Sequence, residues 1–92
     1  MTNSIDFNAD EHRYEIKVDD VLAGFSVVRE NDEAVTFTHT EIFDQFEGQG
    51  LASELVTEAL DDVRLRGKKV VALCPYVKRY VEKHPDYADL LA

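Results

Sequence analysis

The chain is poor in positive charge. Of its 92 residues, 10 are Lys or Arg and 19 are Asp or Glu, which gives a net charge of −9 with His neutral. Grooves that bind nucleic acids and faces that bind anionic membranes both depend on clustered Lys and Arg. The charge balance therefore argues against a nucleic-acid partner and against a membrane surface.

Cysteine and long apolar runs are also scarce. Cys74 is the one cysteine, so the chain cannot form an internal disulfide. No apolar run approaches the length of a membrane span. The N-terminus, Met1 to Asp6, lacks the basic and apolar regions of a secretory signal. We therefore expect a cytoplasmic protein, and we take it to be a monomer or a weak dimer.

The first half of the chain has the pattern of β-strands. Apolar and polar residues alternate over residues 13–18, and strand signals recur at 22–29 and 35–40, with a weaker one at 5–7. Short polar turns separate these segments. They predict an antiparallel meander. In its last strand we place Val35, Phe37 and His39 on one face and Thr36, Thr38 and Thr40 on the other.

The second half changes to a helical period. Residues from Leu51 onward predict a helix that Gly67 ends, followed by a buried strand over 70–74 and a short helix over 77–83. Pro85 stops that helix, and residues 86–91 allow one more turn. The sequence therefore predicts one α+β domain over residues 1–92, with its core at about 10–91. Its sheet is mixed and mostly antiparallel, with a strand–Gly loop–helix–strand core.

The junction at Gln45–Ala52 carries the clearest functional signal. A loop spelled Q-x-x-G-x-G leads from the last strand of the meander into the long helix. Gly48 and Gly50 let the backbone approach a ligand closely. The helix start adds unpaired N–H groups and the positive end of its dipole. This arrangement favours an anion-binding site, and the alternative is a tight turn that happens to use two glycines.

The motifs around this loop resemble the GNAT acyltransferase superfamily, whose signature [QR]-x-x-G-x-[GA] holds the pyrophosphate of an acyl-coenzyme A. Their order is similar to a short, single-domain GNAT-like N-acetyltransferase family that includes N-acetyltransferase domain-containing protein 1. The motifs are H-T-E at 39–41, G-Q-G-L-A at 48–52, L-C-P-Y at 73–76 and H-P-D-Y at 84–87. The resemblance implies a minimal GNAT-like fold. A full GNAT domain usually has two helices where this chain has only the turn at Asp19-Asp20, and those helices help to form the acceptor site.

The resemblance implies acetyl-coenzyme A, or another acyl-coenzyme A, as co-substrate, without a metal. Backbone groups of Glu41, Ile42 and Phe43 would pair with the pantetheine arm. Backbone amides would hold the pyrophosphate, and these belong to Glu47, Gly48, Gln49, Gly50, Leu51, Ala52 and Ser53. Superfamily members often have Arg at the position of Glu47. Because a carboxylate repels a pyrophosphate, we expect the Glu47 side chain to point outward.

Acyl transfer from a thioester to an amine needs a base for the amine. His39 lies on the strand before the Gly loop, two residues from Glu41, and histidine exchanges protons near neutral pH. We predict that it is the base, against the alternative of a histidine satisfied by its strand neighbours. Cys74, at the end of the buried strand, is a candidate nucleophile or a neighbour of the thioester. The alternative for Cys74 is a buried structural thiol.

The leaving thiolate needs a proton, and Tyr80 and Tyr76 are the candidate donors. In the superfamily the general-acid tyrosine lies on the helix after the buried strand, at a position that falls at or beside Val81 here. Tyr80 is adjacent to Val81, and its alternative role is that of a packing aromatic residue.

Three functional hypotheses remain at this point. The first is an N-acyltransferase that uses acetyl-coenzyme A to acylate an unidentified amine. The second is a non-catalytic acyl-coenzyme A-binding protein, a sensor or a carrier. The third is a structural domain in which the Gly loop is only a turn. The one basic stretch, between Arg64 and Lys83, fits either a solvated surface or a dock for the phosphates of the nucleotide.

Overall fold

Five strands form a single sheet in the order β1-β2-β3-β4-β5 in the computed structural model, which describes residues 2–92. The strands are β1 (Asn3–Asn8), β2 (Arg13–Val18), β3 (Val21–Glu30), β4 (Ala34–Ile42) and β5 (Lys69–Ala72). The first four pair antiparallel in chain order, and β5 pairs parallel to β4. The predicted α+β fold with a mixed, mostly antiparallel sheet is confirmed, and the weak signal at 5–7 belongs to a full strand.

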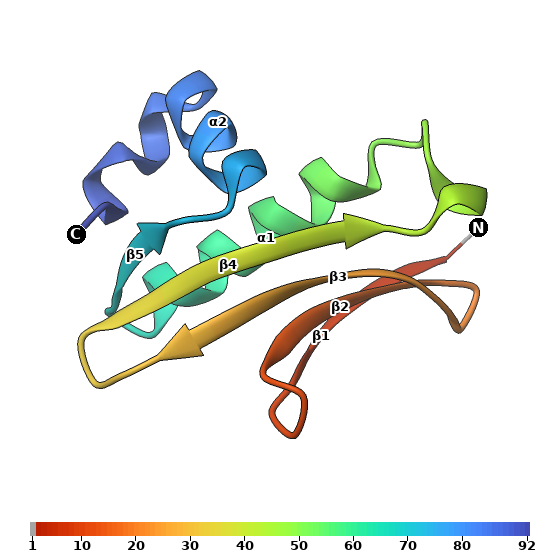
Figure 1. The fold of residues 1–92 in the computed structure, drawn as a ribbon, viewed down its shortest axis with the longest axis horizontal. Coiled ribbons are helices and arrows are strands. Elements are labelled where there is room, and N and C mark those ends of the chain that lie inside the picture. Colours follow the sequence, from red (N-terminus) through yellow and green to blue (C-terminus); the bar gives the residue numbers. More distant parts are fainter. Residues whose placement is uncertain (1) are drawn as a thin grey trace.

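The described residues also form four helices, and the two α-helices pack on one face of the sheet (Figure 1). The four helices are α1 (Leu51–Leu65), α2 (Pro75–Lys83) and two 3₁₀ helices, η1 (Asp44–Phe46) and η2 (Pro85–Leu90). The long helix α1 crosses strands β2 to β5, and α2 packs on β4, β5 and α1. Within residues 2–92 no helix is long and apolar enough to cross a membrane.

The core fills the space between the sheet and α1. Strand β2 alternates as predicted, with Tyr14, Ile16 and Val18 buried. One side of α1 is buried against them, at Leu51, Leu55, Val56, Ala59, Leu60 and Val63. Gly67, with φ of +72°, follows the helix, and the Lys68 N–H donates to the Val63 carbonyl at 3.2 Å. The predicted helix end at Gly67 is therefore confirmed.

Strand β4 contains a β-bulge that the sequence pattern did not indicate. Phe37 pairs with Val28 and His39 with Val27, so Thr38 is an extra residue on β4. An extra residue reverses the alternation of faces. Phe37 is fully buried, and three residues later Thr40 bonds the buried Ser26 on the same face. The prediction that His39 shares a face with Val35 and Phe37 is wrong, because the bulge turns His39 and Glu41 to the opposite face.

That opposite face is less covered. Among the described residues its side chains are half-buried or exposed, as at Phe25, Val27 and His39. The Arg13 guanidinium lies 4.4 Å from the centre of the Phe25 ring. The sheet thus separates a packed face, which holds α1 and α2, from an open face that carries His39.

Candidate functional site

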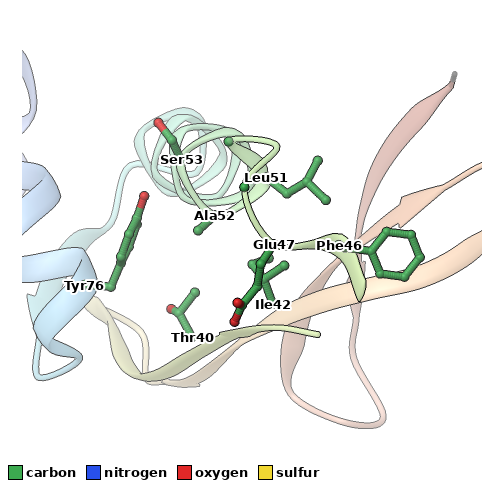
Figure 2. Close-up of a pocket in the computed structure, with 10 residues that line it drawn as sticks. Thr40, Ile42, Phe46, Glu47, Leu51, Ala52, Ser53 and Tyr76 are labelled. Atoms are coloured by element: carbon green, nitrogen blue, oxygen red, sulfur yellow. The ribbon is translucent and has the colours of Figure 1, made fainter. Parts of the chain in front are cut away.

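A cavity of about 450 Å³ lies where the end of β4 meets the start of α1 (Figure 2). Its volume is within the usual range for small-molecule sites. Its wall comes from four elements: β4, the 44–50 loop, α1 and α2. The lining residues are Thr40, Ile42, Phe46, Glu47, Gly48, Gly50, Leu51, Ala52, Ser53 and Tyr76. Most of the residues predicted for cofactor binding therefore meet at one cavity.

The Gly loop supplies backbone donors to this cavity. Gly48 has φ of +81° and Gly50 has φ of +73°, which is the left-handed region that glycine adopts without strain. Gly50 is the N-cap of α1 and has no side chain to cap the helix, and the first helical bond runs from the Glu54 N–H to the Gly50 carbonyl. The N–H groups of Leu51, Ala52 and Ser53 therefore have no carbonyl partner within the helix. Unpaired N–H groups at the positive end of a helix dipole are suited to binding an anion.

Strand β4 presents a free backbone edge to the same cavity. Leu73 and Cys74 both donate their N–H groups to the Phe37 carbonyl, at 3.1 and 2.8 Å, and the β4–β5 ladder ends there. On the other side, the Phe43 N–H donates to the Ala23 carbonyl at 2.8 Å. Bonded and non-bonded pairs alternate in an antiparallel ladder, so the backbone groups of Thr40 and Ile42 point away from β3.

The direction of these backbone groups on β4 corrects part of the predicted contact with the pantetheine arm. Ile42 has the orientation that such a contact requires. The Phe43 N–H is already bonded to β3, and the alternation assigns the Glu41 backbone to β3 as well. Thr40, which the sequence analysis did not propose, occupies the corresponding place on the free edge.

Beneath Thr40 lies a small polar network. The Thr40 hydroxyl is 2.8 Å from the Ser26 hydroxyl, and the Cys74 thiol donates to Thr40 Oγ1 at 3.4 Å. Ser26 is fully buried, and Cys74 is only 3% exposed. Cys74 is thus behind the cavity wall and separated from the cavity by Thr40. This placement matches the alternative prediction for Cys74, a buried structural thiol. Cys74 also lies next to the free edge of β4.

Of the two tyrosines on α2, Tyr76 lines the cavity and Tyr80 does not. Thr57 donates its one hydroxyl proton to the Ser53 carbonyl at 2.7 Å, so Tyr80 must be the donor in its short bond to Thr57. The Tyr80 ring also stacks on His84, with ring centres 4.0 Å apart. Tyr80 is therefore a buried packing residue whose proton is already bonded, which corrects its prediction as the acid.

Tyr76 lies one helical turn earlier, and Figure 2 shows its hydroxyl on the same side of the cavity as Ser53. The pKa of Tyr76 is raised above its ordinary value, chiefly because burial disfavours the phenolate. Tyr76 is therefore a protonated donor at neutral pH, at the wall of the cavity.

His39 and Glu41 lie on the open face, outside the cavity wall. Their side chains are paired, with His39 Nε2 3.2 Å from Glu41 Oε1, and both are substantially exposed. The His39 ring is 6.2 Å from the Phe25 ring. A paired imidazole and carboxylate can accept a proton from a group that approaches from this face. Within residues 2–92 no three His, Cys, Asp or Glu side chains are grouped so as to hold a metal ion.

Glu47 is solvent-exposed, as an outward-pointing side chain would be, but it also borders the cavity. Figure 2 shows its carboxylate turned toward the side formed by Thr40 and Ile42. The predicted basic dock is absent from the wall, because no Lys or Arg is among the ten described residues that line it. Arg64 pairs with Asp89, and Arg66 and Lys68 pair with Glu30, all near the far end of α1.

The fold and the Gly-loop geometry agree with a comparison against protein families. The family model described as GCN5-related N-acetyl-transferase matches residues 13–90. The chain belongs to this family. The match covers strands β2 to β5, the Gly loop and α2, and so includes every residue of the cavity wall.

The chain is similar in sequence to proteins named NATD1. Protein NATD1 of Xenopus tropicalis is 36% identical over 53 residues, and human Protein NATD1 is 37% identical over 51 residues. These matches cover 58% and 55% of this chain. The chain spans about half the length of these relatives, 49% and 45% respectively.

Solved GNAT structures share the fold. A solution structure of a GCN5-like protein from Staphylococcus aureus has a TM-score of 0.72 at 23% identity, covering 97% of this chain and 87% of the other. A GNAT family acetyltransferase from Elizabethkingia anophelis, with acetyl-CoA bound, has a TM-score of 0.58 at 18% identity and covers 65% of this chain and 40% of the other. The GNAT-like fold predicted from the motifs is confirmed.

Proposed function

We propose that this GNAT domain transfers an acetyl group from acetyl-coenzyme A to an amine. The observation that carries the proposal is the cavity in which a free strand edge leads directly to a helix N-terminus. The edge suits the amides of a pantetheine arm, and the helix start suits a pyrophosphate. Acetyl-CoA is bound in the solved GNAT relative, which supports this choice of donor.

In the proposed complex the pyrophosphate accepts hydrogen bonds from backbone amides between Glu47 and Ser53. The pantetheine arm pairs with the Thr40 and Ile42 edge of β4. The thioester then lies near Thr40, where β5 diverges from β4, with Cys74 behind it and Tyr76 beside it. The amine approaches from the open face, because His39 and Glu41 are on that face.

The chemistry follows from this placement. The amine nitrogen attacks the thioester carbonyl, forming the C–N bond, and the C–S bond then breaks. His39 accepts the proton that the amine loses, and Glu41 stabilises the resulting imidazolium. Tyr76 donates the proton that the leaving thiolate takes up.

Ligand binding is the first test of this proposal. Acetyl-coenzyme A at one hundred times its Kd is expected to stabilise the native state by about 2.7 kcal/mol, because it binds the folded state and not the unfolded state. Thermal unfolding at increasing ligand concentration measures this, with adenosine as a control that has neither phosphate nor pantetheine. If the melting temperature does not change over the titration, the cavity is not a donor site. Turnover of an amine panel then tests transfer.

A non-catalytic acyl-coenzyme A-binding protein is the second candidate. Two observations favour it: Tyr80 and Cys74 are buried, and His39 lies outside the cavity wall. This function is the better one if the wild type binds acetyl-coenzyme A and acylates no amine above background.

Cys74 gives a second, local prediction. Saturating coenzyme A is expected to slow its alkylation by iodoacetamide, because the ligand would cover Thr40, through which the buried thiol meets the cavity. Intact-mass spectrometry over time measures the rate, and adenosine is again the control. An unchanged rate in protein shown to hold the ligand would place the donor elsewhere. Intact-mass spectra recorded with acetyl-coenzyme A, without iodoacetamide, test covalent transfer, since an acetyl adduct that Cys74→Ala abolishes would show an acyl-enzyme.

A further inference from the structure

The cavity wall contains backbone N–H groups that suit an anion and also a carboxylate, which repels one. Leu51, Ala52 and Ser53 offer helix-start amides, and the Glu47 side chain shares the same wall. Figure 2 shows the carboxylate on the side of the cavity where β4 offers its free edge. A negative charge at this place repels a phosphate group within a few ångströms.

Nothing in the described wall compensates for this charge. The ten lining residues include no Lys or Arg. On α2, Lys78 and Arg79 follow the wall residue Tyr76 but do not themselves line the cavity. The basic groups of α1 lie at its other end, a helix length of about 22 Å away for its 15 residues. That distance exceeds the Debye length of about 8–10 Å in ordinary buffers, so their field is screened. The chain as a whole adds a net charge of −9.

From this we infer that Glu47 determines ligand specificity: its charge weakens the hold of the loop amides on the donor's phosphates. The inference rests on the proposed function, since it concerns the same cavity. It predicts a ligand preference that a basic pyrophosphate site would not have. Raising the salt concentration should strengthen coenzyme A binding by screening the repulsion.

The test compares coenzyme A, dephospho-coenzyme A and pantetheine by calorimetry in the wild type and in Glu47→Gln. We expect Glu47→Gln to raise coenzyme A affinity about fivefold, the effect of one unit charge at about 4 Å in water. Pantetheine affinity should stay within a factor of about two, because it has no phosphate to repel. Wild-type affinity for coenzyme A should rise between about 20 and about 200 mM NaCl, and this rise should shrink in Glu47→Gln.

Glu54→Gln is the matched control. It removes the same charge from the first turn of α1, but Glu54 faces β1, where the Asn3 amide donates to it at 3.0 Å. An equal gain in Glu54→Gln would show a general charge effect and would overturn the assignment to Glu47. The assignment would also be overturned if Glu47→Gln left the coenzyme A affinity unchanged, or if it raised the affinity for pantetheine as much as that for coenzyme A.

The outcomes also separate this inference from the proposed function. Tight coenzyme A binding that weakens with salt would overturn the role of Glu47 and leave the donor site intact. If neither protein binds any of the three compounds, the donor site is wrong and the inference fails with it. Binding of all three with the expected order of effects supports both.

Discussion

Replacing Gly48 and Gly50 together with Val is expected to abolish acetyl-coenzyme A binding while leaving a folded domain. Both glycines have positive φ, and a β-branched residue in that region is strained by about 1–3 kcal/mol. A Cβ built at either position meets no atom within 4 Å, so the effect comes from the backbone and not from a clash. The loop should relax to another conformation, and the amides would then no longer converge. Calorimetry measures the binding, and circular dichroism checks the fold.

Gly67→Val is the control for that experiment. Gly67 has φ of +72° and similarly open surroundings, but it follows the far end of α1. It should lose comparable stability per substitution and keep its ligand affinity. Wild-type affinity in the Gly48→Val/Gly50→Val protein would show that the loop is only a turn.

The second large effect is expected from His39→Ala. A positioned base contributes roughly 10²–10⁴-fold to a proton-transfer step. We therefore expect the acetyl-transfer rate constant to fall at least about 100-fold. Affinity for acetyl-coenzyme A should be nearly unchanged, because His39 is on the face opposite the cavity-lining Thr40. Thiol release under saturating substrate measures the rate, and calorimetry measures the affinity.

His12→Asn serves as the comparison, since His12 lies in the turn between β1 and β2 and its φ of +53° suits Asn. It should retain full activity. A His39→Ala enzyme that keeps both the wild-type rate and the wild-type pH profile would remove His39 from the mechanism. A fall in acetyl-coenzyme A affinity of the same size would instead indicate damage to the donor site.

Local patterns carried most of the fold prediction. The alternation at Tyr14, Ile16 and Val18 and the helical period from Leu51 each reflect one buried face, so they can be recognised from sequence alone. Gly67 ends its helix for a local reason as well. The Gly loop was recognisable because its two glycines stand between a strand and a helix.

Tertiary pairing decided the parts that were missed. The bulge at Thr38 depends on how β4 pairs with β3 over the whole length of the two strands. No residue type in the sequence indicates it. The roles of Tyr76 and Tyr80 depend on the rotation of α2 against α1, which the Thr57–Tyr80 bond fixes. Period-two reasoning therefore placed His39 on the wrong face and missed Thr40.

The β-bulge divides the side chains at the end of β4 between the two faces of the sheet. A regular strand would direct Thr38 and Thr40 to one side, and His39 and Glu41 to the side that Phe37 occupies. With one inserted residue, neighbours in the sequence lie on different faces: Thr40 borders the cavity proposed for the donor, and His39 and Glu41 face the side proposed for the acceptor. Substitutions at 39 or 41 can thus alter the acceptor side without touching the donor wall. A one-residue insertion or deletion before position 39 would exchange the two sets of side chains.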